Sequence, residues 1–334
     1  MDQNTILVTG GYGFIGSALC RYLYKYTKCN IIIIDKLTYA SNLLSLESII
    51  NDKRVIFYQG SIGDRTLVKK ILNNHNPHLV FNLAAETHVD NSIKNPSIFV
   101  ETNVLETHFF LEEILFYYLK DKEINKNFKI LHISTDEVYG DIDINDEPVT
   151  EAAPYNPSSP YSATKASSDH LVKSYFRTFK LPALISHCSN NFGPFQNSEK
   201  FIPVIVSNIL NKKKIPVYGD GMQIREWLFV DDHCDALFKI IKKGKIGESF
   251  NIGSIQSITN IDLIRKILSA MYKNSLIKSQ DYRDYIKFVP DRFGHDRRYA
   301  INSDKVKKTC GWEEKTDFDT GIELTIKSLI KNKT

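Results

Sequence analysis

The first half of the chain alternates short aliphatic runs with longer segments in which apolar and polar residues are mixed. The aliphatic runs are rich in β-branched residues, which is typical of strands buried on both faces of a parallel sheet. The segments between them, such as residues 14–26 and 64–75, are expected to be helical. This alternation indicates an α/β fold, a Rossmann-type doubly wound parallel sheet. The predicted strands are residues 5–9, 31–34, 55–58, 79–83, 129–133 and 183–186.

The pattern changes beyond about residue 190, where the predicted strands shorten and glycines recur. We therefore expect a larger sheet domain over residues 1–190, to which later segments return, and a smaller C-terminal α/β portion over residues 191–334. Residues 121–127 are expected to form an exposed connection. The segment around residues 101–119 has little polar face and must be covered nearly all round. Either a subunit interface or ordinary burial within the domain could cover it.

The composition excludes several classes of protein. Of the 334 residues, 42% are hydrophobic, which is enough for a packed core. The net charge of +4 comes with dispersed lysines, which fits a solvated surface or a small anionic substrate but not a nucleic-acid groove. We find no signal peptide and no apolar run long enough to cross a membrane. The cysteines are far apart, which argues against a metal site or a disulfide framework and favours a reducing, cytoplasmic location: Cys20, Cys29, Cys188, Cys234 and Cys310.

A glycine-rich turn follows the first predicted strand. Gly11, Gly13 and Gly16 have the spacing G-x-G-x-x-G, and Gly10 precedes them. Glycines there let backbone N–H groups approach a pyrophosphate, and the N-terminus of the next helix adds a favourable dipole. Asp35 ends the second strand, where its carboxylate can bind both hydroxyls of a ribose and would repel a 2′-phosphate. The sequence therefore predicts a dinucleotide site in the first domain and favours NAD over NADP.

Small residues end the fourth predicted strand, in the run Leu83-Ala84-Ala85. Such residues allow a cofactor to lie against the backbone at this edge of the sheet. Plain close packing between elements is the alternative explanation.

Five side chains could carry out chemistry beside this cofactor. Tyr161 and Lys165 are four residues apart and so share one face of a helix, where the ammonium would favour a phenolate that acts as a base. Thr135, Asp136 and Glu137 follow the fifth strand, at the edge where doubly wound sheets bind ligands. Adjacent carboxylates repel, so one tends to keep its proton and the other to stay ionised.

The acid pair changes the expected chemistry. A threonine, a tyrosine and a lysine suffice to oxidise an alcohol with a nicotinamide. The additional acid and base point to an elimination coupled to the redox step. A solvated loop or a helix cap is the alternative reading of an arbitrary Asp-Glu pair.

With these residues assembled, the chain resembles the extended short-chain dehydrogenase/reductase superfamily. Within it, the chain is similar to the nucleoside-diphosphate-glucose 4,6-dehydratases, of the dTDP-glucose 4,6-dehydratase type. The resemblance runs nearly from end to end, and the threonine-acid-acid block is its most specific part. The matching blocks are the glycine turn and residues 35–40, 83–90, 134–140, 161–165, 188–194, 218–227 and 291–299.

The resemblance implies a reaction sequence. Tyr161 would take the proton from the glucose 4-hydroxyl, which Thr135 hydrogen-bonds, while the hydride leaves C4 for NAD. Glu137 would then remove the acidified C5 proton, and Asp136 would protonate the departing 6-hydroxyl. The hydride would return to C6, giving a 4-keto-6-deoxy sugar on the way to 6-deoxyhexoses such as rhamnose. NAD would stay tightly bound and be regenerated in each turnover.

The resemblance also implies contacts, and dimerisation through two helices per subunit. The expected NAD contacts are Gly10, Gly13, Phe14, Ile15, Gly16, Asp35, Lys36, Leu37, Thr38, Ser61, Ile62, Leu83, Ala84, Ala85, Thr102, Tyr161, Lys165 and Asn191. The expected substrate contacts are Thr87, Thr135, Asn190, Lys200, Phe201, Pro216, Val217, Tyr218, Arg225, Asn260, Asp291, Arg292 and His295. Arg225 suits a diphosphate because its planar fork matches phosphate oxygens, and Tyr218 offers a ring face to the base.

Two positions depart from the family pattern, and some alternatives stay open. Ser61 stands where an acidic residue commonly faces the adenine, and Asn91 stands where arginine is frequent. A sugar 4-epimerase of the same fold needs no acid pair, and a nucleotide-sugar decarboxylase typically lacks the acid at position 136. A non-catalytic NAD-binding scaffold should tolerate loss of the reacting groups, all of which are present. The sequence does not decide between dTDP-glucose and UDP-glucose.

Overall fold

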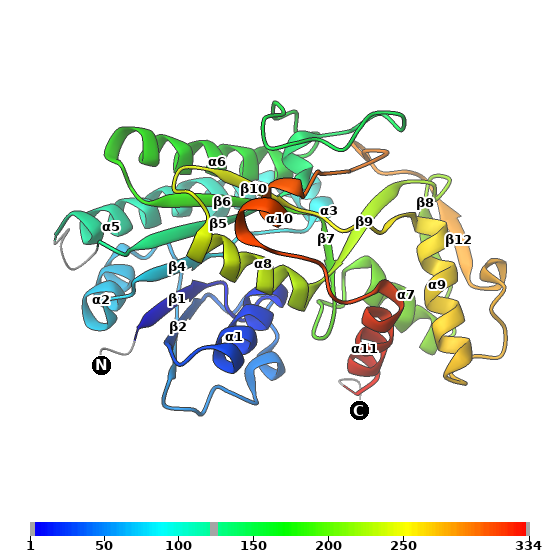
Figure 1. Ribbon diagram of the computed structural model, residues 1–334. Coiled ribbons are helices and arrows are strands. Elements are labelled where there is room, and N and C mark those ends of the chain that lie inside the picture. Colours follow the sequence, from blue (N-terminus) through cyan, green and yellow to red (C-terminus); the bar gives the residue numbers. More distant parts are fainter. Residues whose placement is uncertain (1–3, 121–125, 332–334) are drawn as a thin grey trace.

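The computed structural model describes residues 4–120 and 126–331. Its centre is a seven-stranded parallel sheet in the order β10-β6-β5-β4-β1-β2-β3, with helices on both faces (Figure 1). The six predicted strands are all present, and a seventh, β10, comes from the second half of the chain and pairs with β6. The strands are β1 (Thr5–Thr9), β2 (Asn30–Asp35), β3 (Val55–Gln59), β4 (Leu79–Asn82), β5 (Lys129–Thr135), β6 (Ala183–Cys188) and β10 (Ser249–Ile252).

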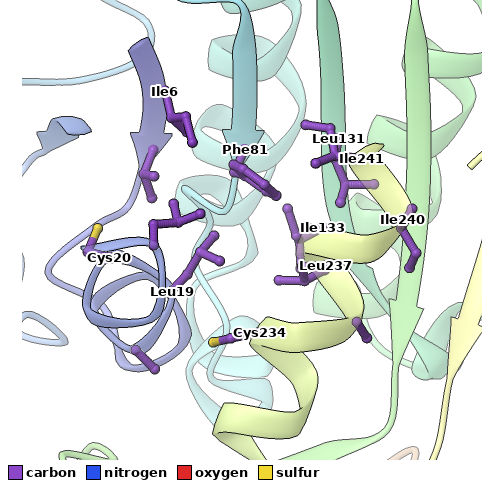
Figure 2. Close-up of a cluster of buried hydrophobic side chains, with 14 of the residues drawn as sticks. Ile6, Leu19, Cys20, Phe81, Leu131, Ile133, Cys234, Leu237, Ile240 and Ile241 are labelled. Atoms are coloured by element: carbon purple, nitrogen blue, oxygen red, sulfur yellow. The ribbon is translucent and has the colours of Figure 1, made fainter. Parts of the chain in front are cut away.

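Successive residues of the central strands point to opposite faces, and both faces are buried. Ile6 of β1 packs in one hydrophobic cluster and its neighbour Leu7 in another. The first cluster lies under α1 (Phe14–Tyr26) and α8 (Val230–Lys243), as Figure 2 shows for Leu19 and Leu237. The second lies under α2 (Arg65–His75), α5 (Thr107–Lys120) and α6 (Pro160–Phe179). This double cover explains why these strands are aliphatic along their whole length.

The rest of the second half builds a smaller unit beside the carboxyl ends of the strands (Figure 1). It has two small sheets, β11-β9-β7 and β12-β8, and a hydrophobic cluster of its own. Its strands are β7 (Asn190–Phe192), β8 (Ile215–Tyr218), β9 (Ile224–Phe229), β11 (Ser257–Thr259) and β12 (Ile286–Val289). Its helices are α7 (Phe201–Leu210), α9 (Asn260–Lys273) and α11 (Phe318–Lys331), while α10 (Asp304–Cys310) packs on α8 and β10.

Short helical segments complete the described chain. They are η1 (Leu43–Leu46), α3 (Val89–Lys94), α4 (Pro96–Phe99), η3 (Asp136–Tyr139) and η4 (Tyr282–Asp284). Within residues 4–120 and 126–331, no helix combines the length and the apolar character that a membrane crossing needs.

The apolar segment near residues 101–119 forms a π-helix, η2 (Val100–Glu106), that continues into α5. Burial within the chain covers one side of it, where Phe110 and Ile114 are fully buried. Phe116 keeps 60% of its surface exposed and Leu119 keeps 42%. The fold therefore supplies only part of the cover that we expected. Of the predicted connection over residues 121–127, only residues 126 and 127 are described, and both are exposed.

Candidate active site

A cavity of about 540 Å³ lies at the carboxyl ends of the sheet strands, between the sheet and the smaller unit. Its walls contain residues that follow β1, β2, β4, β5 and β6, together with residues from α7, β8 and β9. Parallel strands place their carboxyl ends at one edge, which is why residues far apart in the sequence meet here.

The glycine turn forms one end of the cavity. Gly10 has a φ of +65°, and a Cβ there would lie 2.9 Å from Ala84 N. A Cβ on Gly16 would lie 2.1 Å from Gly10 O, so the turn and the first turn of α1 touch through backbone alone. Gly13 is the N-cap of α1 and has no side chain to bind the first amides of that helix. Those amides are therefore available to an anion, as a pyrophosphate site requires.

Two alanine substitutions should separate packing from cofactor binding in this turn. Gly16→Ala should destabilise the fold by about 1–3 kcal/mol or more, because the new methyl meets a backbone oxygen that cannot rotate away. Gly13→Ala meets Gly10 O only at 3.2 Å, so its main effect should be on NAD affinity. Urea unfolding and NAD titration of both variants measure the two effects. Equal stability loss in both variants would contradict this assignment.

Asp35 is held in a fixed orientation at the end of β2. Its Oδ2 accepts from Tyr12 N at 2.9 Å, and its Oδ1 accepts from Leu37 N at 2.8 Å and from Ser41 Oγ at 3.1 Å. Leu37 itself does not line the cavity. Its φ of 58° belongs to the backbone turn that brings its N–H to Asp35. The carboxylate lines the cavity beside Thr38, where a ribose would meet it.

Ser61, just after β3, was expected to contact NAD but does not line the cavity. Its hydroxyl accepts from Gly63 N at 2.8 Å, whereas the neighbouring Ile62 does line the cavity. The carboxylate that lines this part of the cavity is Glu106, which the sequence did not single out. Glu106 pairs with Lys36 at 2.7 Å and leaves its second oxygen without a partner. Lys36 also donates to Thr102 Oγ1 at 3.4 Å.

The residues around the cavity fit a dinucleotide. Thr9 Oγ1 accepts from Leu83 N and Ala84 N, which fixes the backbone at the end of β4. Leu83, Ala84 and Ala85 line the cavity there. Asn191 lines the cavity with a buried Oδ1 that has no partner in the protein. Together with the free helix amides and Asp35, this side-chain oxygen matches the needs of the phosphates, a ribose and a carboxamide. Phe14 and Ile15 complete the wall.

The reacting groups meet at the other end of the cavity. Thr135 is the last residue of β5, and its side chain caps the η3 turn by accepting from Glu137 N at 3.3 Å. Its one hydroxyl proton can go either to Asp136 Oδ1, at 3.3 Å, or to the Tyr161 oxygen. Ser159 caps α6 and so places Tyr161 in its first turn, facing the cavity. Asp136 of η3 and Tyr161 of α6 thus both lie beside the Thr135 hydroxyl.

The two carboxyl groups have different environments. Burial, followed by the charge of Glu137, raises the pKa of Asp136 to about 8. Asp136 Oδ2 is buried without a partner, which suits a carboxylic acid that keeps its proton. Burial also raises the pKa of Glu137, but the charges of Arg292 and Arg225 oppose that rise. The pair therefore offers an acid at position 136 and an ionisable base at position 137.

The expected effect of Lys165 on Tyr161 is not found. Lys165 Nζ donates to Ile133 O at 2.7 Å. Burial, followed by the charges of Glu137 and Cys188, raises the pKa of Tyr161 well above its ordinary value, and a hydrogen bond with Thr135 opposes that rise. The ammonium lies in the same cavity but does not by itself produce a phenolate. A cationic nicotinamide ring beside the phenol would favour ionisation.

Most of the predicted substrate residues also line the cavity: Thr87, Asn190, Lys200, Phe201, Pro216, Tyr218, Arg225, Asn260, Arg292 and His295. Two do not. Val217 points into the hydrophobic core of the smaller unit and is 1% exposed, because alternate residues of β8 face opposite sides. Asp291 accepts from His295 Nδ1 at 2.6 Å and so orients a lining residue instead.

Arg225 is more constrained than the sequence suggested. Its Nη1 donates to Ile224 O at 2.8 Å, and its Nη2 donates to Asp296 O at 2.8 Å. Its guanidinium lies 4.1 Å from the centre of the Tyr299 ring. The side chain is thus fixed in place before any phosphate arrives, and its charge also reaches Glu137.

Several cavity residues escaped the sequence analysis. They are Glu86, Glu106, Cys188, Gln196, Trp227 and Tyr299. Cys188, Trp227 and Tyr299 belong to blocks that we quoted, but no chemical feature distinguished them there. Glu86 also lies in a quoted block, in the loop before α3, and Glu106 is the last residue of η2; only the tertiary fold brings both to the cavity.

Comparisons with known proteins agree with this geometry. Residues 7–325 match the family model described as GDP-mannose 4,6 dehydratase. The chain is 44% identical over 333 residues to dTDP-glucose 4,6-dehydratase of Neisseria meningitidis, covering 98% of this chain and 94% of that protein. It is 46% identical over 340 residues to an Escherichia coli dTDP-glucose 4,6-dehydratase, with coverage of 98% and 94%.

A solved structure also matches this chain over nearly its full length. The crystal structure of DesIV, the dTDP-glucose 4,6-dehydratase of Streptomyces venezuelae with NAD and TYD bound, has a TM-score of 0.90. It is 36% identical and covers 98% of both chains. Together with the full-length sequence matches, this shows that the chain belongs to the dTDP-glucose 4,6-dehydratase family of the extended short-chain dehydrogenase/reductases.

Proposed function

We propose that this protein converts dTDP-glucose to its 4-keto-6-deoxy derivative, with NAD as a resident cofactor. The observation that carries the proposal is the acid pair of buried Asp136 and partly buried Glu137, directly after Thr135 in a cavity that fits a dinucleotide. An epimerase or a decarboxylase of this fold does not need both acids. The product would serve a pathway that makes 6-deoxyhexoses such as rhamnose.

The oxidation uses the hydroxyl groups at the end of the cavity. Tyr161 accepts the proton of the glucose 4-hydroxyl, and Thr135 holds that oxygen through the same hydrogen-bond network. The glycine turn, Asp35 and Asn191 would hold NAD, which would supply the hydride acceptor for oxidation at C4 and the hydride donor for reduction at C6. Lys165 lines the cavity one turn further along α6, where its ammonium would be available to the nicotinamide ribose.

The elimination uses the acid pair. A ketone at C4 makes the C5 proton acidic, and Glu137 removes it as the base. Asp136, protonated at neutral pH because of its burial, gives its proton to the 6-hydroxyl, which leaves as water. When the hydride is added at C6, C5 takes back a proton from Glu137, which has exchanged with solvent. Both carboxyl groups line the same cavity as Thr135, which supports oxidation and elimination on one bound sugar.

The pH dependence should report on these two groups separately. Asp136 acts only while protonated, so water loss should slow by about tenfold per pH unit above a pH of about 8. Glu137 acts only while ionised, and its raised pKa should place the acid limb above the ordinary pKa of a glutamate. Product formation, measured across the pH range with NAD saturating, checks both limbs. An elimination rate that keeps rising well above pH 8 would contradict the role of Asp136.

Isotope labelling tests the reaction itself. Purified protein with NAD is incubated in heavy water with dTDP-glucose or with UDP-glucose. We expect a 4-keto-6-deoxy product deuterated at C5, formed faster from dTDP-glucose. A 4-epimer without deuterium at C5 would identify an epimerase instead, and equal rates would leave the thymine methyl without a role in selection.

We also propose a homodimer. The exposed apolar side chains Leu105, Phe116 and Leu119 of η2 and α5, and Phe179 at the end of α6, support it. Such side chains gain most by packing against a second copy. Light scattering should give twice the mass of the chain, and Phe116→Glu should shift it to the monomer. A monomeric wild-type protein would refute the proposal.

A further inference from the structure

Asp169 is a fully buried carboxylate on α6 that the steps above do not use. It lies one helical turn beyond Lys165, so both side chains share a face of the helix. Its Oδ2 accepts from Ser134 Oγ at 2.9 Å and from the Tyr155 hydroxyl at 3.1 Å, and it lies 3.1 Å from His187 Nε2. Three polar groups converge on Oδ2, whereas Oδ1 is buried without a hydrogen-bond partner, so the carboxylate is only partly compensated in the interior.

His132 lies between Asp169 and Lys165. Its Nε2 is 3.5 Å from Asp169 Oδ1 and 3.5 Å from Lys165 Nζ. Burial, followed by the charge of Lys165, lowers the pKa of His132 to about 3. The imidazole is therefore neutral and does not neutralise the carboxylate. It is a polar spacer between a cation and an anion.

The tautomer of His132 is set by hydrogen bonds that begin at Thr9, next to the expected cofactor site. Thr9 Oγ1 accepts from Leu83 N and Ala84 N, so its own proton goes to Asn82 Oδ1 at 2.7 Å. That leaves Asn82 Nδ2 to donate to His132 Nδ1 at 3.0 Å. The ring proton of His132 is then on Nε2, on the side of Asp169. A chain of buried polar groups thus runs from Thr9 to His132, whose Nε2 donates to Ser168 Oγ at 3.2 Å and lies 3.5 Å from Asp169 Oδ1.

We propose that Asp169 is the positioning residue that keeps Lys165 charged during the oxidation. This rests on the proposed function, because it assumes that the cavity oxidises a sugar at Tyr161. The ammonium of Lys165 is buried, and its protein hydrogen bond is to the carbonyl of Ile133. A buried ammonium loses its proton readily unless an anion lies nearby. Asp169 supplies that anion from the same helix, across His132.

The surroundings of both groups support this pairing. Burial lowers the pKa of Lys165, and the charge of Asp169 is the largest effect that raises it, followed by that of Cys188. The titratable groups that act on Asp169 come from four elements and one loop: His132 of β5, His187 of β6, Tyr139 of η3, Tyr155 of the loop before α6, and Lys165 and Lys173 of α6. Lys173 Nζ donates to the Tyr155 hydroxyl at 3.0 Å.

The test compares Asp169→Asn with Tyr155→Phe in the NAD-loaded protein. Both substitutions disturb hydrogen bonds of the same carboxylate, but only the first removes its charge. In single-turnover reactions with dTDP-glucose, Asp169→Asn should move the alkaline limb of NADH formation down by about one pH unit or more. Tyr155→Phe should leave that limb where it is in the wild type. A uniform loss of rate at every pH in Asp169→Asn, with no shifted limb, would overturn the proposal.

A second measurement covers the case in which Asp169→Asn folds poorly. If its defect is an unpaired ammonium, adding Lys165→Met should restore much of the lost thermal stability. If the defect is the loss of the donors around Asp169, the double variant should be no more stable than the single one, and the proposal falls. This comparison of thermal stability does not require the protein to turn over a sugar. Failure of the proposed function would appear separately, as a wild-type protein that forms no NADH with dTDP-glucose.

Discussion

Replacing Asp136 by Asn and Glu137 by Gln is expected to stop water loss while NAD remains bound. The amides keep the size of both side chains but can neither give nor take a proton, so the elimination should slow by about 10²–10⁴-fold. Tyr161 and Thr135 are unchanged, so the first oxidation should still occur. NADH should therefore accumulate on the protein after substrate is added, which its near-ultraviolet absorbance reports.

The chain contains a matched control for this experiment. Asp146 and Glu147 are also adjacent acids, but both are exposed in the loop after η3. The same two substitutions there should leave product formation unchanged. An unchanged yield of 4-keto-6-deoxy sugar in the Asp136→Asn/Glu137→Gln variant would remove the acid pair from the mechanism.

The sequence was a good guide to those features that depend on local pattern. The aliphatic runs of β1 to β6 were predicted because these strands, apart from the edge strand β3, are buried on both faces, and the helix from Phe14 to Tyr26 was predicted with its observed bounds. The glycine turn was recognisable because only backbone fits where Gly10 and Gly16 touch. The acid pair after Thr135 was noticed because two adjacent acids follow a buried strand.

Features that depend on tertiary contacts were harder to predict. β10 joins the sheet from the second half of the chain, and its short run of residues gives little signal of this. Val217 and Tyr218 are adjacent, yet one is in the core and the other in the cavity, which the register of β8 decides. The pKa of Tyr161 follows from its burial beside Glu137, whereas the spacing of Tyr161 and Lys165 pointed the other way.

Tyr161→Phe should suppress the oxidation by about 10²–10⁴-fold, because the phenol is the group placed to take the 4-hydroxyl proton. Rapid mixing with dTDP-glucose should show little transient NADH, while NAD titration shows normal binding. Tyr118→Phe is the control for loss of a tyrosine hydroxyl, since Tyr118 packs on Phe128 away from the cavity. Normal transient NADH in Tyr161→Phe would contradict the role of the phenol.

The Tyr161→Phe variant and the Asp136→Asn/Glu137→Gln variant should also fail at different steps of the reaction. If the sugar is supplied already oxidised at C4, with NADH in the cofactor site, Tyr161→Phe should still release water because Asp136 and Glu137 are intact. The Asp136→Asn/Glu137→Gln variant should fail with the same substrate although its Tyr161 is intact. That crossed pattern follows only if the phenol acts before the ketone exists and the acids act after it. If both variants failed equally on the oxidised sugar, the phenol and the acids would have to act in the same step.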